Sequence, residues 1–415
     1  MKCELVIVGA GPAGLAAAQA AASRGCDIVI IDDNPRAGGQ IWRNGPQHAP
    51  GTAARARLCV LQLPSVRYLP GTRIIASPAP GCLLLENAEQ GLLLHYQQLI
   101  LCCGARELLL PFPGWTLPGV TGAGALQALV KNGMPMKDER TVIAGSGPLL
   151  LASAATAQKA GAKLLRVLEQ APMARLLGFS AQLWRWPSKA VQAISLATAS
   201  YRTGALVLEA LGDQRLQAVR IQQGQRVEEI ECDHLACGYG LIPNTQLASY
   251  LGCQLNGNAV AVDLLQRTSR PAHLAAGECT GVGGSELALI EGEIAGWMAV
   301  GEERKARELL TRKAQWQRFA DQLRECFTLT PKVGNLARAD TLLCRCEDIA
   351  LRDIQGQPGW TAAKLQSRCG MGACQGRVCG TAAQVLFGWT PTPPRAPLVP
   401  ARIGTLLLEG TAQER

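Results

Sequence analysis

Hydrophobic residues at the start of the chain form two short runs that end in glycine or in acids. The apolar run Leu5–Val8 is followed by Gly-Ala-Gly-Pro-Ala-Gly at 9–14 and by an alanine-rich segment, and a second run, Ile28–Ile31, ends in Asp32 and Asp33. Runs with such boundaries predict buried parallel strands, and the alanine-rich segment predicts a helix between them. The pattern therefore predicts a strand, a glycine turn, a helix and a second strand.

The spacing of the glycines favours a dinucleotide-binding turn. Gly9 permits a sharp turn, Gly11 lets the backbone approach a pyrophosphate, and Gly14 lets the helix pack closely on the strand. The helix N-terminus would present N–H groups to the phosphates, and the acid after the second strand would hold a ribose hydroxyl. The residues expected to contact the dinucleotide are Gly9, Gly11, Pro12, Ala13, Gly14, Asp32 and Asp33.

The same pattern recurs in the middle of the chain. A strand is predicted at 141–144, the turn after it reads Gly-Ser-Gly-Pro-Leu-Leu, and after a helix a second strand at 163–168 ends in an acid. The apolar window 141–158 approaches the length of a membrane span, but the turn inside it favours a buried strand and helix. The acid would suit NAD rather than NADP, and another ligand or no ligand stays open. The residues expected to contact a nucleotide here are Gly145, Gly147 and Glu169.

Three further apolar strands run into glycine, and the last of them is followed by Gly277 and Glu278. In flavoproteins with two dinucleotide-binding domains, such a strand ends in Gly-Asp and its acid binds the ribityl chain of the flavin. Here Glu278, one methylene longer, takes that place. A glycine pair after the first unit also allows close approach to a ligand. The contacts expected from these segments are Gly39, Gln40, Gly104, Gly277 and Glu278.

Composition adds few constraints. The formal charge of +9 is spread along a chain with only 4% aromatic residues, which argues against nucleic-acid binding. No signal peptide is apparent at the start, so we expect a reducing compartment in which the 16 cysteines are free thiols or metal ligands. A helix is predicted from His48 to about Pro64. The basic and aromatic stretch 170–201 suggests a surface or subunit contact, and 301–327 suggests an amphipathic connecting helix, with a membrane or partner role as the alternative.

Cysteines gather near the C-terminus. The pair Cys344 and Cys346 is followed by Cys369, Cys374 and Cys379, with glycines between the last three. Soft thiolates among small residues favour a [2Fe–2S] cluster, whereas zinc, or no metal, is the alternative. The expected ligands are Cys344, Cys346, Cys374 and Cys379, with Cys369 in reserve.

Several motifs together resemble one family. They are Gly38-Gly39-Gln40, the segment 112–120, the glycine turn at 145–150, the segment 277–281, and Arg368-Cys369-Gly370-Met371-Gly372 with Cys374-Gln375-Gly376-Arg377. In these motifs, over nearly its whole length, the chain resembles the alpha subunit of the opine oxidase, hydrogen cyanide synthase and hydroxyproline dehydrogenase family. Its last part is similar to bacterioferritin-associated ferredoxin (BFD).

The resemblance implies an α/β fold of two Rossmann-like domains, the second inserted in the first, followed by a small α-helical BFD-like domain. The predicted domains are an FAD-binding domain at 1–110 and 236–300, a second, NAD-like Rossmann domain at 111–235, a helical linker at 301–335, a [2Fe–2S] domain at 336–395 and a tail at 396–415. FAD is implied at Gly9, Gly11, Gly14, Asp32 and Glu278.

The resemblance also implies an electron-transfer subunit of an amine or imino-acid dehydrogenase of the D-hydroxyproline, opine or glycine type. A D-amino-acid-oxidase-like flavoprotein beta subunit would oxidise the amine, and electrons would pass to a respiratory acceptor. A third, ferredoxin-like subunit and an FMN shared with the beta subunit stay open. The location implied is the cytoplasm, free or peripheral to the inner membrane.

Two other functions are compatible with the residues. One is a self-sufficient NAD(P)H-dependent reductase that passes electrons to a protein partner, and the other is a non-enzymatic regulatory or assembly protein. No dithiol motif follows either glycine turn, which argues against a disulfide reductase. The four histidines show no spacing typical of an acid–base pair, so no catalytic residue is predicted.

Overall fold

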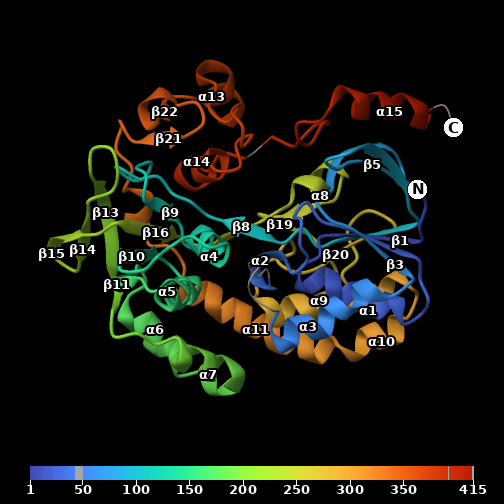
Figure 1. Ribbon diagram of the computed structural model, residues 1–415, viewed down its shortest axis with the longest axis horizontal. Coiled ribbons are helices and arrows are strands. Elements are labelled where there is room, and N and C mark those ends of the chain that lie inside the picture. The colour runs from blue at the N-terminus through green and yellow to red at the C-terminus, as the bar shows by residue number, and fades with distance from the viewer. Residues whose placement is uncertain (43–49, 391, 414–415) are drawn as a thin grey trace. The chain divides into compact units, whose positions relative to one another are not determined.

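The structure, a computed structural model of the 415-residue chain, describes residues 1–42, 50–390 and 392–413 (Figure 1). The chain forms two compact units: unit 1 is Met1–Arg106, Ile242–Asp321 and Pro393–Arg415, and unit 2 is Glu107–Leu241 and Gln322–Thr392. These divisions at 106/107 and 241/242 compare with expected divisions at 110/111 and 235/236. Unit 2 contains the cysteine segment. The chain passes from unit 1 to unit 2 within β8 (Ala105–Glu107) and returns to unit 1 within β17 (Leu241–Pro243).

Unit 1 is built on a five-stranded parallel sheet in the order β20-β7-β1-β2-β3. Its central strand is the apolar run predicted first, and Leu5 pairs with Ile28 on one side and with Gln98 on the other. Because all four residues of β2 are buried, the sheet is covered on both faces, as parallel sheets require. The strands are β1 (Leu5–Val8), β2 (Ile28–Ile31), β3 (Val66–Leu69), β7 (Gln98–Leu101) and β20 (His273–Ala275).

Two helices pack closely in unit 1: α1 (Pro12–Ala22) and α9 (Ser285–Ala299) lie side by side (Figure 1). A Cβ atom on Gly292 would lie 2.1 Å from the carbonyl oxygen of Ala13, and one on Gly296 would lie 2.3 Å from that of Ala17. Small residues on both helices therefore set the interhelical distance.

The rest of unit 1 includes an antiparallel sheet in the order β4-β5-β6, against which α15 packs. The predicted 48–64 helix is present as α3 and a 3₁₀ turn, and His48 lies outside the described residues. The amphipathic segment is two helices, broken at Leu309, where a single helix was expected. The remaining elements are α2 (Gly39–Trp42), α3 (Thr52–Leu58), η1 (Cys59–Gln62), β4 (Arg73–Ala79), β5 (Cys82–Glu86), β6 (Gly91–His95), α8 (Gln246–Tyr250), β18 (Leu255–Asn256), β19 (Ala259–Val260), α10 (Glu303–Glu308), α11 (Leu310–Cys326), which continues into unit 2, and α15 (Ile403–Gln413).

Unit 2 repeats the parallel architecture with strand order β12-β11-β10-β16-β9. This confirms the second predicted strand–turn–helix–strand pattern. The sheet and its helices are β9 (Val120–Gly122), α4 (Ala123–Lys131), β10 (Arg140–Gly145), α5 (Leu149–Lys159), β11 (Lys163–Glu169), α6 (Met173–Ser180), η2 (Leu183–Arg185), α7 (Pro187–Ser195), β12 (Tyr201–Thr203) and β16 (His234–Gly238). A three-stranded antiparallel sheet adds β13 (Ala205–Leu211), β14 (Ala218–Gln223) and β15 (Arg226–Glu231).

The cysteine segment of unit 2 is made of short elements. They are α12 (Pro331–Gly334), β21 (Leu342–Cys344), β22 (Ile349–Ala350), η3 (Leu351–Asp353), α13 (Trp360–Ser367) and α14 (Cys379–Phe387).

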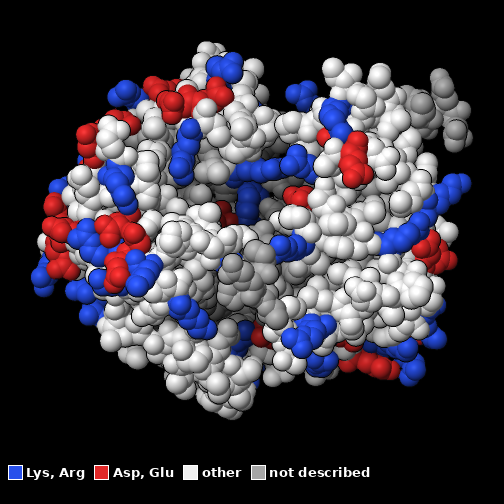
Figure 2. Space-filling view, in the orientation of Figure 1, with Lys and Arg blue, Asp and Glu red and all other residues white. Residues whose placement is uncertain are grey.

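Charges of both signs are interspersed on the face seen in Figure 2. Within unit 2, Arg220 pairs with Glu209 at 2.6 Å and with Glu229 at 2.8 Å across β13, β14 and β15. Among the described residues, no helix is both long and apolar enough to cross a membrane.

We expect Gly292→Ala to destabilise unit 1 by about 1–3 kcal/mol, because the added methyl group would force α9 away from α1. Urea unfolding followed by circular dichroism would measure the change. Gly404→Ala in α15 is the control: its Cβ would meet nothing within 4 Å, so no loss of stability is expected, and the higher helix propensity of alanine adds at most about 1 kcal/mol of stability. Equal midpoints for Gly292→Ala and the wild type would contradict the packing argument.

Candidate cofactor sites

The first glycine turn joins β1 to α1 and requires two of its glycines for steric reasons. Gly9 has φ +106°, and a Cβ there would lie 2.2 Å from the carbonyl oxygen of Cys102. A Cβ on Gly14 would lie 1.9 Å from the carbonyl oxygen of Gly9. Gly11 has ordinary backbone angles and only a 3.7 Å contact to Gly39, so its side is left free for a ligand. The structure therefore gives Gly11 the position expected for close approach of a pyrophosphate.

The glycine pair after β2 lies against this turn. The N–H of Gly38 donates to the carbonyl oxygen of Ala10 at 2.8 Å, and a Cβ on Gly39 would lie 3.0 Å from the Cα of Gly11. Gly39 and Gln40 begin the short helix α2, and Gln40 is exposed. Two segments predicted separately as ligand contacts thus form one backbone surface.

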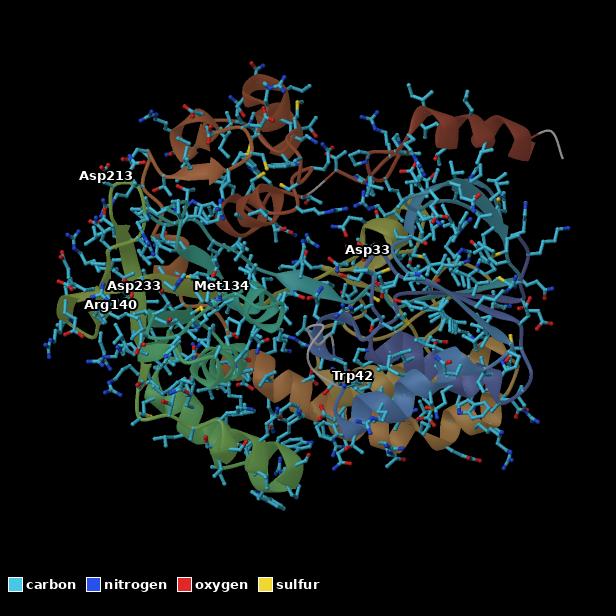
Figure 3. All side chains as sticks on the ribbon, viewed as in Figure 1. Asp33, Trp42, Met134, Arg140, Asp213 and Asp233 are labelled. Atoms are coloured by element: carbon cyan, nitrogen blue, oxygen red, sulfur yellow. The ribbon has the colours of Figure 1, made fainter. Side chains whose placement is uncertain are left out.

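The two acids at the end of β2 differ in what they do. Asp32 is buried, and its carboxylate accepts hydrogen bonds from the N–H of Ala10 at 2.7 Å and from the N–H of Asn34 at 2.8 Å. Asp33, which is labelled in Figure 3, is exposed and accepts one from the side-chain amide of Asn34 at 3.0 Å. Asp32 therefore braces the glycine turn, whereas Asp33 presents its carboxylate outward.

Glu278 has a buried carboxylate oxygen that tests whether this edge fits a ligand. Its Oε1 accepts a hydrogen bond from the N–H of Gly284 at 2.8 Å, but its Oε2 is buried without a partner among the described residues. Burial raises the pKa of this carboxyl above its usual value. Since buried polar atoms are nearly always hydrogen-bonded, Oε2 fits a hydroxyl group of a bound ligand, as the flavin prediction requires.

Parallel strands bring these groups together within unit 1. The glycine turn follows β1, Asp32 and Asp33 follow β2, Gly104 follows β7, and Gly277 and Glu278 follow β20, so all lie beyond the carboxyl ends of one sheet. Ligands of such sheets bind at that edge.

Sequence reasoning missed Glu291 at this edge. This acid is 5% exposed and lies among the buried residues of α9, where its carboxylate accepts hydrogen bonds from the N–H of Gly277 at 2.9 Å and the hydroxyl of Thr280 at 3.1 Å. Glu291 falls four residues after Leu287 and three before Ile294, on the apolar stripe of the helix, and this spacing was the signal that could have identified it.

The second glycine turn joins β10 to α5 and is built differently. A Cβ on Gly145 would lie 1.9 Å from the carbonyl oxygen of Gly238, so the sharp turn again needs glycine. Glu169 is fully buried, and its two oxygens accept hydrogen bonds from the N–H groups of Gly147 and Ala171, each at 2.8 Å. Burial raises the pKa of Glu169 to about 7. Glu169, which was expected to bind a ribose hydroxyl, thus accepts hydrogen bonds from the backbone of its own domain.

All five cysteines of the C-terminal segment lie in unit 2, in two neighbouring groups. The Sγ atoms of Cys344, Cys369 and Cys379 lie within 4.8 Å of one another and are buried. Cys346 and Cys374 are more exposed, and their side chains interact with each other. The structure therefore brings together two of the expected ligands with the reserve residue Cys369, and the other two as a pair.

Glycines between and directly after these cysteines have a packing role that the sequence did not reveal. Cβ atoms on Gly370, Gly376 and Gly380 would lie 2.6, 3.0 and 3.1 Å from the indole ring of Trp360. A Cβ on Gly372 would lie 2.3 Å from the Cβ of Cys346. Glycine is therefore needed so that the cysteine loop can fold over Trp360.

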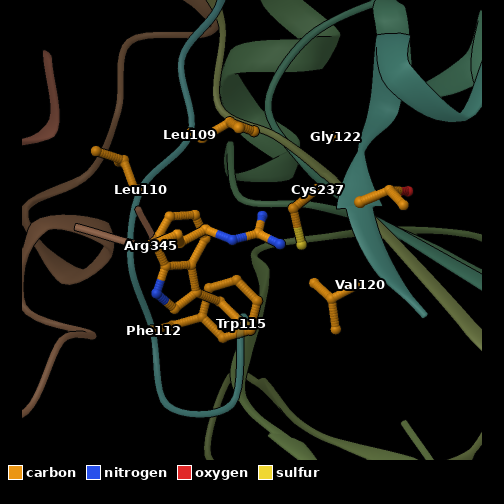
Figure 4. A pocket seen from close by; sticks show the side chains of 9 residues that line it. Leu109, Leu110, Phe112, Trp115, Val120, Gly122, Cys237 and Arg345 are labelled. Carbon is orange, nitrogen blue, oxygen red and sulfur yellow. The ribbon is translucent and has the colours of Figure 1, made fainter. Parts of the chain in front are cut away.

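Trp115, in the Pro/Gly-rich segment after β8, holds the cysteine segment to the second Rossmann-like domain. Its indole N–H donates to the carbonyl oxygen of Leu342 at 2.6 Å, and the guanidinium group of Arg345 lies over its ring, 5.2 Å from the centroid. Trp115 and Arg345 line a small cavity together with Phe112 and Cys237 (Figure 4). This contact places Cys344 and Cys346 beside the domain.

Comparison with known proteins agrees with this architecture. Residues 3–300 match the family model described as pyridine nucleotide-disulphide oxidoreductase. The chain is 31% identical to the hydrogen cyanide synthase component HcnB of Pseudomonas aeruginosa, with 91% of each chain covered. It is 30% identical to an opine oxidase subunit of Agrobacterium tumefaciens, with 91% of this chain and 84% of that protein covered.

Solved structures show the same fold. The crystal structure of L-proline dehydrogenase from P. horikoshii matches with a TM-score of 0.67 and 16% identity, covering 98% of this chain and 79% of that chain. That of T. acidophilum thioredoxin reductase matches with a TM-score of 0.56 and 22% identity, covering 74% and 99%. The chain thus belongs to the pyridine nucleotide-disulphide oxidoreductase family and, within it, to the oxidoreductase subunits related to HcnB and to the opine oxidase component of Agrobacterium.

Proposed function

We propose that this chain is the FAD- and [2Fe–2S]-containing electron-transfer subunit of a heteromeric amine or imino-acid dehydrogenase. Its partner would be a D-amino-acid-oxidase-like flavoprotein that oxidises a D-hydroxyproline, an opine or glycine. The observation that carries the proposal is a cluster of three cysteines whose Sγ atoms lie within 4.8 Å of one another. It occurs in a chain that also has a dinucleotide-binding fold. Relatives of similar length carry the name of subunits, which supports a heteromeric enzyme.

FAD would be held at the carboxyl edge of unit 1. The backbone at Gly11 and Gly39 would face the pyrophosphate, Asp33 would accept from a ribose hydroxyl, and Oε2 of Glu278 would accept from the ribityl chain. The other residues proposed at this site are Gly9, Pro12, Ala13, Gly14, Asp32, Gln40, Gly104 and Gly277.

A [2Fe–2S] cluster would be held in unit 2 by Cys344, Cys346, Cys374 and Cys379. Cys344 and Cys379 supply two thiols from the buried group, and the neighbouring pair Cys346 and Cys374 supplies two more. When bound, a flavin exchanges electrons in pairs or singly and an iron–sulfur cluster exchanges one at a time, so the two groups can link a two-electron oxidation to a one-electron acceptor.

Two of the described histidines, His234 and His273, support placing amine oxidation outside this chain. His273 begins β20, so it lies at the amino end of the unit 1 sheet, opposite the edge that carries Glu278, and His234 begins β16, at the amino end of the unit 2 sheet. His273 hydrogen-bonds the carbonyl oxygen of Pro271 at 2.7 Å, and His234 lies 3.3 Å from Glu139. An acid–base group for amine chemistry is therefore expected on the partner.

The proposal locates the complex in the cytoplasm, free or on the inner membrane, where a respiratory acceptor could be reduced. An FMN shared with the beta subunit and a third, ferredoxin-like subunit would extend the same electron path.

We expect Glu278→Ala to weaken FAD binding about ten- to hundredfold, because a hydrogen bond to a charged acceptor contributes roughly 1.5–3 kcal/mol. Glu278→Gln, which keeps an acceptor for the N–H of Gly284, should retain more FAD than Glu278→Ala. Flavin content after ultrafiltration measures both. The exposed Glu89, changed to Ala, is the control and should leave FAD content unchanged. Full FAD retention in Glu278→Ala would contradict the assignment.

We expect Cys374→Ser to remove the cluster's iron and visible absorption while FAD stays bound, because the FAD residues lie in unit 1. Cys369→Ser should keep the cluster, and Cys59→Ser, at an exposed thiol of unit 1, is the control. Metal analysis and electron paramagnetic resonance measure the outcome. Loss of iron in Cys369→Ser but not in Cys374→Ser would show that Cys369 is a ligand and Cys374 is not. Zinc in place of iron would refute the redox assignment.

We expect the purified chain alone to give no dye reduction with a D-hydroxyproline, an opine or glycine. Addition of its flavoprotein beta subunit should give substrate-dependent dye reduction, because the oxidising site would lie there. The beta subunit without this chain is the matched control, and it should transfer electrons to the dye more slowly. Complete amine oxidation by the isolated chain would refute the proposed division of labour.

A further inference from the structure

The second glycine turn is covered by a segment of its own chain. Residues 327–330, here called the strap, follow α11 and lie in unit 2 together with the turn. The hydroxyl of Ser146 donates to the carbonyl oxygen of Phe327 at 3.0 Å. The side-chain N–H of Gln170 donates to the carbonyl oxygen of Thr328 at 3.2 Å, and its oxygen accepts from the N–H of Thr330 at 2.9 Å. Hydrogen bonds from both the turn and the end of β11 therefore hold the strap.

The ring of Phe327 fills the space beside the second glycine of this turn. A Cβ on Gly147 would lie 4.0 Å from the ring, which is van der Waals contact. The ring also packs edge-on against Phe179, with centroids 6.0 Å apart, and Arg175 donates to the carbonyl oxygen of Thr328 at 3.1 Å. In a dinucleotide site this glycine is small so that the pyrophosphate can approach the backbone. Here a side chain of the protein occupies that approach.

Exposure distinguishes the two turns. Gly9 and Gly11 of the first turn are partly exposed, whereas Gly145, Ser146 and Gly147 of the second are all buried. The N–H of Gly147 is also engaged by the carboxylate of Glu169. The first turn is therefore accessible to a ligand, and the second has its polar groups satisfied within the protein.

We infer that the strap takes the place of a pyrophosphate and that the second Rossmann-like domain binds no nicotinamide nucleotide. The strap leads directly into α12 and the cysteine segment, so this edge of the second domain serves to anchor that segment. Electrons then cannot enter from NAD(P)H at this domain, which excludes the self-sufficient reductase. The inference concerns binding alone and does not depend on the identity of the amine.

The test combines nucleotide binding with amide exchange on the full-length, FAD-loaded protein. Calorimetry with NADH and with NADPH should show no binding, and neither should reduce the flavin within seconds. The amide of Thr330 should be protected from exchange in the wild type. Gln170→Ala removes its acceptor and should speed exchange of this amide roughly fivefold or more, since a hydrogen bond contributes about 1 kcal/mol. Gln158→Ala, at an exposed position of α5, is the control and should leave exchange unchanged.

Stoichiometric NADH or NADPH binding to the wild type, or rapid flavin reduction by either, would overturn the inference. So would unprotected strap amides in the wild type, or an exchange rate that Gln170→Ala leaves unaltered. These outcomes are separate from the proposed function, because amine-dependent dye reduction with the beta subunit tests the latter without any nicotinamide nucleotide.

Discussion

The hydrogen bond from a backbone N–H of a glycine turn to a carboxylate at the end of the next strand organises both halves of this protein. In unit 1 the bond joins Ala10 to Asp32, and in unit 2 it joins Gly147 to Glu169. Both acids are buried, so each bond is shielded from water. It fixes the turn relative to the sheet before any ligand is present. What differs is what remains free: Asp33 provides a second, exposed acid in unit 1, whereas the second turn is covered by the strap.

The strand and helix pattern could be predicted because it depends on local sequence. Apolar runs beside glycine and acids gave both parallel sheets, and the steric contacts of Gly9, Gly14 and Gly145 show why no other residue fits. The position of Glu278 at the sheet edge could also be predicted, because this residue directly follows a predicted strand. The prediction of a single helix at 301–327 was wrong, because the helix is interrupted at Leu309. The spacing of apolar residues along this segment did not indicate that interruption.

Contacts between distant segments could not be predicted in this way. The strap touches Ser146 from 181 positions away, and Trp115 meets Leu342 from 227 positions away. Neither segment has a sequence pattern that identifies its partner, because a backbone carbonyl group accepts hydrogen bonds whatever the side chain of its residue. The cysteine loop shows the same limit. Its glycines suggested backbone contact with a cluster, whereas the structure shows that three of them make room for Trp360.

These long-range contacts give the duplicated architecture its asymmetry. A protein with two equivalent dinucleotide sites could accept electrons from NAD(P)H and pass them to a flavin in the same chain. Closing one site removes that entrance, and the closing segment continues into the cysteines, so the second domain becomes the support of a redox segment. The orphaned oxygen of Glu278 remains at the accessible edge. If that edge binds FAD, reducing equivalents must arrive from outside the chain, which is the physical reason for a partner subunit.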